Sequence, residues 1–364
     1  MKPRTLATLV VLGALALAAG WYFGIAQEPQ AESTTDNGRL MFRELPAHLG
    51  DATQVELVHG ANTVRIVRDA ATQTWGLAQR DGYPVDVGKL RALLTGLTEL
   101  RLVERRTADP AELGKLGLDD PAGKDASATL IRVTDAAGQP IAALVAGHSR
   151  MRTGGTLPDE IYVRRPDENQ SWLAEGKLDV DSDPLTWLDR DIMDIAPARV
   201  ASVGITSGTT LLKLVKNGDK LTMQTPADHP PLDDGHLDDV THALELLSLQ
   251  DVRKDANAPA GDALGTSVFT TDDGLAITAT PSKADGDLWV RFAVAATDDK
   301  ANVGAKAEAQ GLTERLAGWT YQIGGWKLKA LIPTLDDLKA PPPPAPPKSI
   351  STPAAPSPPA PAKP

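Results

Sequence analysis

The chain carries an internal repeat, and this feature restricts its fold more than any other. Two runs of alternating apolar and polar residues recur later in the sequence together with one large apolar residue: Val55–Leu57 recurs as Val203–Ile205, Val64–Arg68 as Leu212–Lys216, and Trp75 as Met223. All three matches have the same offset of 148 residues. Alternation with a period of two predicts strands with one buried and one solvated face. The sequence therefore predicts two copies of a small antiparallel unit.

An amphipathic helix is predicted after these strands in each copy. In the first copy Asp86 is placed to cap the helix, and the apolar positions at helical spacing are Leu90, Leu93, Leu94, Leu97 and Leu100. In the second copy Asp233 and Asp234 precede the equivalent positions, which are Leu237, Val240, Leu244 and Leu247. Matching Leu94 with Leu244 and Leu97 with Leu247 raises the offset to 150 residues. We therefore expect the loop before the second helix to be two residues longer.

Further strands are predicted where β-branched and apolar runs alternate with turns rich in Gly and Asp. They cover residues 129–133, 141–145 and 160–164 in the first copy, and 267–270, 275–280, 288–294 and 319–323 in the second. Ala301–Leu316 has few helix breakers and predicts one more helix. The predicted fold class is α+β, with two tandem copies of a mostly antiparallel β-sheet unit, each carrying an amphipathic helix, after one N-terminal transmembrane helix.

The transmembrane helix is predicted from the uncharged apolar run Leu6–Ile25, which follows the basic residues Lys2 and Arg4. Twenty helical residues span about 30 Å, the thickness of a bilayer core. By the positive-inside rule the basic start stays in the cytoplasm, so the expected location is the inner membrane, single-pass, with the bulk of the chain in the periplasm. A cleaved signal peptide is the alternative.

The predicted layout has five parts: a membrane anchor or signal peptide at 1–26, a polar tether at 27–44, a first α+β repeat at 45–196, a second at 197–339, and a proline-rich, disordered tail at 340–364. The tail should adopt extended polyproline II. It is either a ligand for a groove that accepts proline-rich peptides or a solvated spacer.

Composition excludes several classes of function. The formal charge of −11 argues against nucleic acid as a partner, because an acidic protein is repelled by phosphates. The absence of cysteine excludes a lipoprotein start, disulfides and thiol nucleophiles. Aromatic residues make up 4% of the chain, which weakens a carbohydrate-binding reading because few rings are available for stacking on sugars.

One loop has the composition of a weak anion site. Residues 147–156 combine glycines with two arginines, and the candidate ligand-binding residues are Arg150, Arg152, Gly154 and Gly155. Backbone amides and guanidinium groups of this kind could hold a phosphate or carboxylate. The loop lacks the spacing of a P-loop and precedes a strand. The competing interpretation is a plain hairpin connection.

Candidate catalytic and metal chemistry is sparse. The segment Asp179–Asp191 gathers the carboxylates of Asp179, Asp181, Asp183, Asp189 and Asp191, which could serve an envelope hydrolase or remain solvated loop acids. It lacks the glycine and the closing glutamate of a calcium loop. His236 and His242 share one predicted helix but are six residues apart, which should point them to different sides. No catalytic residue, metal or cofactor is assigned.

Four stretches carry a resemblance to a known family: Leu113–Pro121, Ile141–Gly147, Tyr162–Arg164 and Trp187–Asp191. Over Leu45–Leu338 the chain resembles the bacterial family called domain of unknown function 4340. The second copy lacks a clear Gly-Leu-x-x-Pro turn. The resemblance implies an envelope protein with one N-terminal anchor, similar to accessory partners of gliding-type ABC transport systems.

The expected function is accordingly that of a membrane-anchored, extracytoplasmic accessory or scaffold protein. It would bind integral membrane or envelope proteins, such as ABC transporter subunits, with no nucleic acid. The alternative is an envelope hydrolase that uses Asp179–Asp191.

Overall fold

The computed structural model describes residues 38–150, 159–297 and 301–341, and it divides the chain into two compact units. The first unit comprises Met1–Arg190 and Gln250–Ala258, and the second comprises Asp191–Leu249 and Pro259–Pro364. The predicted anchor at 6–25 lies outside the described residues, as does the tail beyond residue 341. Among the helices that the structure describes, none has the length and apolar character needed to cross a membrane.

The first unit is built on one antiparallel sheet with the strand order β1-β6-β10-β9-β8-β7-β2-β3-β4-β5. These strands are β1 (Arg39–Leu40), β2 (Gln54–His59), β3 (Asn62–Arg68), β4 (Trp75–Leu77), β5 (Tyr83–Pro84), β6 (Arg101–Arg105), β7 (Thr129–Thr134), β8 (Pro140–Arg150), β9 (Glu160–Arg164) and β10 (Ser171–Glu175). The described helices are α2 (Leu45–His48), α3 (Val87–Glu99) and α4 (Pro110–Leu113), and the later strand β16 (Asp251–Lys254) also belongs to this unit.

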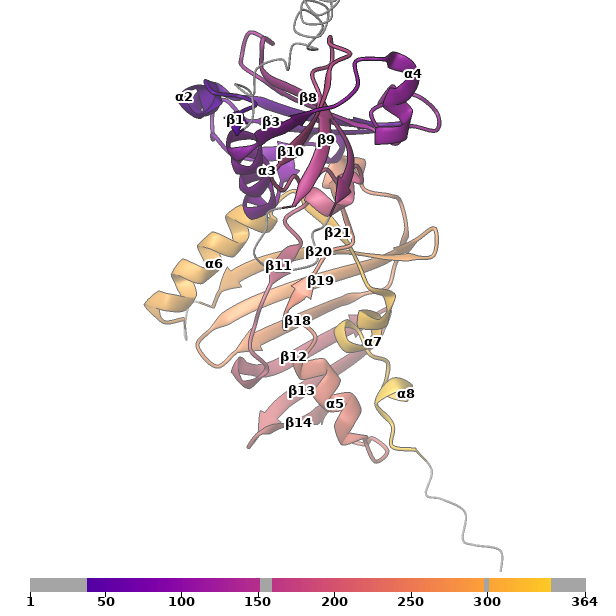
Figure 1. The fold of residues 1–364 in the computed structure, drawn as a ribbon. Coiled ribbons are helices and arrows are strands. Elements are labelled where there is room, and N and C mark those ends of the chain that lie inside the picture. The colour runs from indigo at the N-terminus through magenta and orange to yellow at the C-terminus, as the bar shows by residue number, and fades with distance from the viewer. Residues whose placement is uncertain (1–37, 151–158, 298–300, 342–364) are drawn as a thin grey trace, which may run out of the picture. The chain divides into compact units, whose positions relative to one another are not determined.

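The second unit repeats this plan with the order β14-β13-β12-β18-β19-β20-β21. Its strands are β11 (Asp191–Met193), β12 (Val200–Ser207), β13 (Thr210–Asn217), β14 (Lys220–Thr225), β15 (Leu247–Ser248), β17 (Asp262–Ala263), β18 (Thr266–Thr271), β19 (Leu275–Ala284), β20 (Asp287–Ala296) and β21 (Trp319–Ile323). Its helices are α5 (Asp234–Thr241), α6 (Val303–Leu316), α7 (Leu328–Leu331) and α8 (Leu335–Leu338). In Figure 1, α6 runs along β20, while α5, α7 and α8 lie close together.

The two units share both strand order and the register of their first hairpin. The run β4-β3-β2-β7-β8-β9-β10 of the first unit has the same order as β14-β13-β12-β18-β19-β20-β21 of the second. Val55 lies opposite Ile66, and 148 residues later Val203 lies opposite Leu214. All four side chains are fully buried. The mostly antiparallel α+β fold expected from the alternating pattern is therefore present.

The constant offset ends after this hairpin, which corrects the match of Trp75 with Met223. Met223 lies opposite Leu214, whereas the residue opposite Ile66 is Leu77. Leu77 is therefore the counterpart of Met223. The cause is turn length, because residues 69–74 connect β3 to β4, whereas residues 218–219 alone connect β13 to β14. Gly218 has a φ of 64°, a left-handed conformation that suits a two-residue hairpin turn.

Both predicted helices exist and both begin at the expected cap. The side chain of Asp86 accepts the N–H of Lys89 at 3.0 Å, and that of Asp233 accepts the N–H of Gly235 at 2.8 Å. The caps are 147 residues apart, so the offset of 150 predicted for the helices is wrong. Leu94, expected on the apolar face, is only half-buried.

The second helix is shorter than predicted. It ends at Thr241, and Leu247 lies instead in β15, opposite Met193 of β11. Leu246 has a φ of 44°, and its N–H donates to Asp194 Oδ1 at 3.0 Å. A left-handed residue cannot continue a right-handed helix. The leucine spacing persists beyond the helix because Leu244 and Leu247 are buried in a turn and a strand.

The remaining predictions of secondary structure hold with longer strands. The helix expected over Ala301–Leu316 is α6, and the strand expected over 319–323 is β21. β6 and β10 are the longest described strands that the sequence pattern does not predict, and the short strands β1, β5, β11, β15, β16 and β17 are also absent from the prediction. Charged residues occupy three of the five positions of β6, which obscures the alternation of apolar and polar residues. Four of the five residues of β10 are buried, so its sequence does not alternate between apolar and polar residues.

Candidate functional site

Lys89 of α3 organises the acidic segment that the sequence singled out. Its ammonium nitrogen lies 3.7 Å from a carboxylate oxygen of Asp179 and 3.4 Å from one of Asp181. The same nitrogen is 4.7 Å from the centre of the Trp187 ring, within range of a cation–π contact. The indole N–H of Trp187 donates to the carbonyl of Asp181 at 2.8 Å. Trp187 is fully buried, so these contacts hold the segment on α3.

The carboxylates of this segment have local partners. Partial burial acts to raise the pKa of Asp181, but hydrogen bonds from the Asp183 N–H and the Thr186 hydroxyl, together with Lys89, lower it overall. Asp183 caps a short turn by accepting the N–H of Leu185 at 2.9 Å. The structure thus brings Asp179 and Asp181 together at a lysine. The lowered pKa of Asp181 favours its ionised form, which suits an ion pair with Lys89 better than the role of a general acid.

The predicted anion loop connects two neighbouring strands. Arg150 is exposed at the end of β8, where it lies opposite Glu160 of β9. Arg152, Gly154 and Gly155 lie outside the residues that the structure describes. Because β8 and β9 pair antiparallel, the loop is the connection of a hairpin.

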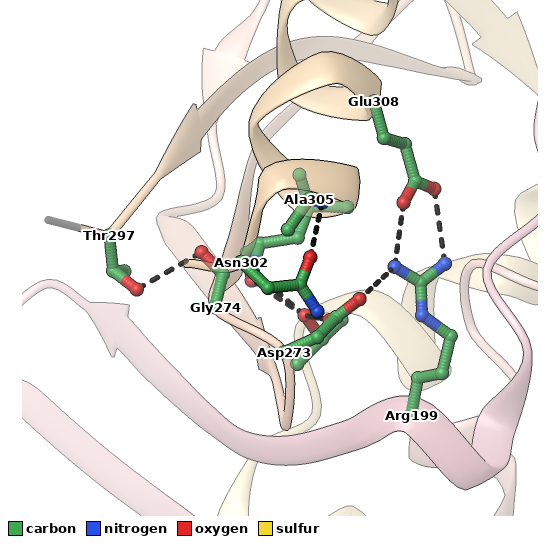
Figure 2. Close-up of polar contacts among 9 residues, drawn as sticks. Arg199, Asp273, Gly274, Thr297, Asn302, Ala305 and Glu308 are labelled. Carbon is green, nitrogen blue, oxygen red and sulfur yellow. Dashed lines mark hydrogen bonds and ion pairs between the residues drawn. The ribbon is translucent and has the colours of Figure 1, made fainter. Parts of the chain in front are cut away.

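A second charged cluster fastens α6 to its sheet (Figure 2). The guanidinium of Arg199 donates to both carboxylate oxygens of Glu308, at 3.1 and 2.6 Å, and to Asp273 at 2.9 Å. Hydrogen bonding to Glu308 is the largest cause of the raised pKa of Arg199. Asp273, in the turn between β18 and β19, has a lowered pKa, chiefly because the Thr271 hydroxyl donates to it. The cluster joins the start of β12, this turn and the helix.

The second unit carries an exposed tryptophan beside a hollow of about 280 Å³. Trp326 follows β21 and has 76% of its surface exposed. The hollow is lined by residues from α5, from its C-cap residue and from the segment 326–338. We call these lining residues together the Trp326 surface: His236, Asp239, His242, Trp326, Lys327, Lys329, Ala330, Asp337 and Leu338.

The indole is held in place although it is exposed. A methyl group added at Gly324 would come within 2.4 Å of its Nε1, so the ring lies directly on the glycine backbone. The ammonium of Lys327 lies 4.8 Å from the ring centre. Tryptophan is enriched among the residues that contribute most to protein–protein binding.

Lys327 itself is buried and anchors the segment to the end of α5. It is 8% exposed, and its ammonium donates to the carbonyl oxygens of His242 and Ala243 at 3.0 and 3.2 Å. Burial lowers the pKa of Lys327, while the negative charges of Glu245 and Asp239 act in the opposite direction. A cation at the C-terminal end of a helix also interacts well with the helix dipole. The ion therefore fixes Trp326 relative to α5.

His236 and His242 both line this hollow, contrary to the expectation that they point to different sides. The physical reason is that α5 ends at Thr241, so His242 is its C-cap and leaves the helical path. In the described part of the chain, no group of three or more histidine and acidic side chains is arranged to hold a metal ion.

Sequence reasoning missed the Trp326 surface. The available signal was the pair Gly324–Gly325 before Trp326 in a polar stretch, since a large ring next to glycines can pack on bare backbone. The hollow also needs His236, Asp239 and His242, which lie 84 to 90 positions before Trp326, and no local pattern links the two segments.

Comparison with known proteins identifies a family. The family model described as Domain of unknown function (DUF4340) matches residues 75–265. No curated protein and no solved structure matches the chain. The family match begins at β4 in the first unit and ends just before β18 in the second. It covers just over half of the 364 residues, and the chain therefore belongs to the DUF4340 family of domains of unknown function.

Proposed function

We propose that this protein is a membrane-anchored, extracytoplasmic accessory protein that binds a protein component of an envelope complex through the Trp326 surface. The observation that supports the proposal is the exposed but positioned indole of Trp326. The placement outside the cytoplasm rests on the sequence of residues 1–25, with its basic start and uncharged run. The choice of an ABC-type transport complex rests on the family resemblance.

The ring is large enough to form the centre of an interface. Burying a whole tryptophan removes about 150–250 Å² from water, and at about 25 cal/mol per Å² that is worth about 4–6 kcal/mol. Because 76% of Trp326 is exposed, most of this surface is still available to a partner. The ring pays little conformational entropy on binding, since Gly324 and Lys327 already restrict it.

The polar rim around the ring suits a protein partner. Asp239 and His236 are exposed on α5, and Lys329 is exposed at the far side of the hollow, where it pairs with Asp337 at 3.0 Å. An aromatic centre with a charged, solvated rim is the usual arrangement of a protein–protein contact. Two weak contacts, one from this surface and one from the anchor, would act at high effective concentration in one membrane.

Site-specific photocrosslinking in cells tests the proposal. A benzophenone amino acid replaces exposed His236 in the full chain, and adducts are identified by mass spectrometry. We expect an integral membrane transport component among them. The yield of this adduct should fall at least tenfold when Trp326→Ala is added. A tenfold loss of affinity corresponds to about 1.4 kcal/mol, which is less than the free energy expected from burial of the ring.

The matched control places the same crosslinker at Val303, which is 86% exposed at the start of α6. Val303→Ala serves as the control for removal of exposed apolar surface. An adduct that forms equally from positions 236 and 303, or that is insensitive to Trp326→Ala, would contradict binding at the Trp326 surface.

A further inference from the structure

The described chain ends beside the Trp326 surface. Asp337 and Leu338 line the hollow, and the last described residue is Pro341. Backbone hydrogen bonds fix this exit point on the segment before α5: Asp233 N–H donates to the carbonyl of Leu338, and Ala340 N–H donates to the carbonyl of Pro231, both at 2.9 Å. Whatever follows Pro341 therefore starts at the rim of the hollow.

The chain that follows is long enough to cover the surface. Residues 342–364 comprise 23 positions, of which 11 are proline. At about 3.1 Å per residue in polyproline II they would reach about 70 Å. The eight residues of α5, which separate the exit point from His242, extend only about 12 Å.

The chemistry of this segment matches the surface. Proline-rich peptides in the polyproline II conformation bind to grooves lined by aromatic rings, because the flat ring packs on the proline rings and little entropy is lost. Trp326 supplies such a ring. The segment also carries Lys348, and the acidic side chains of Asp239 and Glu245 lie around the buried Lys327. Of the carboxylates that line the hollow, Asp239 is exposed and could pair with Lys348, whereas Asp337 already pairs with Lys329.

We propose that residues 342–364 dock on the Trp326 surface of their own chain and cover it until a partner displaces them. The inference rests on the proposed binding function of this surface and adds its regulation. A short tether gives an effective concentration in the millimolar range, so even a weak contact between proline and tryptophan is well populated. Removal of the tail should then raise partner binding roughly two- to fivefold.

Fluorine NMR of the full chain labelled with 5-fluorotryptophan tests the docking directly. The chain has seven tryptophans, and the Trp326 resonance is assigned by its loss in Trp326→Phe. We expect this resonance to shift when the chain is ended after Pro341. A synthetic peptide of residues 342–364 added to the shortened chain should restore the original shift in a saturable way.

Two variants separate docking from a general effect of the tail. Gly324→Ala keeps the backbone conformation, since Gly324 has a φ of −58° and a ψ of 127°, but it displaces the ring. It should weaken the response to the peptide. A tail of unchanged length and charge in which every proline of 342–364 is replaced by glycine should behave like the shortened chain.

A Trp326 resonance that is the same with and without residues 342–364 overturns the proposal. A shift that appears only as the protein concentration rises would assign the occupant to a second copy and would also overturn it. The two proposals fail separately. If the crosslinked adducts depend on Trp326 but the tail does not change the Trp326 resonance, the proposed binding function is supported and tail docking is refuted. If the tail changes the resonance but no adduct depends on Trp326, docking is supported and the proposed binding function is refuted.

Discussion

Replacing Arg199 by methionine should destabilise the second unit by loosening α6. The change keeps most of the aliphatic stem but removes three hydrogen bonds, two to Glu308 and one to Asp273 (Figure 2). These bonds connect the helix to the turn between β18 and β19. One connection to the turn remains, since the N–H of Asn302, the N-cap residue of α6, donates to the carbonyl oxygen of Asp273 at 3.3 Å. We therefore expect a weakened helix, with the fold retained.

The exposure of the three side chains sets the magnitude. Arg199, Asp273 and Glu308 are 31, 29 and 32% exposed, so water partly screens their attraction. Fully exposed ion pairs contribute about 0.2–1 kcal/mol, whereas hydrogen bonds to buried charged groups contribute about 1.5–3 kcal/mol. For two ion pairs at intermediate exposure, we expect the free energy of unfolding to fall by about 1–3 kcal/mol. At an m-value of about 2 kcal/mol per M, this lowers the urea midpoint of unfolding by about 0.5–1.5 M.

The assay combines urea unfolding with amide hydrogen exchange of α6. Lys216→Met is the matched control, because Lys216 pairs with the more exposed Asp272 at 2.9 Å in the same turn. It should cost no more than about 1 kcal/mol. Equal effects of the two variants, or unchanged exchange in α6, would refute the reasoning.

The dependence on pH supplies an independent check. The pKa of Asp273 is lowered in the folded state from its ordinary value of 3.8. Its contribution to stability is therefore present above about pH 3.8 and is lost as the pH falls through the folded pKa. The difference in stability between the wild type and Arg199→Met should shrink in that acid range. A difference that stays constant down to the lowest pH would show that Arg199 acts through packing.

Three further outcomes are expected. Leu97→Ala and Leu244→Ala should each cost about 2–5 kcal/mol in urea unfolding, because each leaves a cavity in a closed core, and half-buried Leu94→Ala should cost clearly less. Asp181→Asn should loosen the segment on α3, seen as faster hydrogen exchange there, and any hydrolysis abolished by this change with folding intact would favour the hydrolase alternative. A reporter that is active only outside the cytoplasm, fused after Leu338, should be active, whereas silence would contradict the predicted topology.

The local elements of this protein could be predicted because they depend on neighbours in the sequence. Alternation over Val55–Leu57 and Val64–Arg68 determines which side chains share a face, and a face that must be buried sets the register of the hairpin. The helix caps Asp86 and Asp233 act on amides only two or three residues away. The strand order of the second unit follows that of the first because similar patterns favour similar pairings.

The end of the second helix and the Trp326 surface depend on contacts between residues far apart in the chain, so only the tertiary structure determines them. Periodicity continues the second helix to Leu247, but pairing with Met193 and the left-handed Leu246 place that leucine in a strand. The Trp326 surface arises in the same way. A buried lysine satisfies the open carbonyls at the end of a helix more than 80 residues earlier in the chain, and in doing so it holds an exposed ring beside two histidines. Such contacts form only when folding brings the two segments together, so they leave no periodic trace in the sequence.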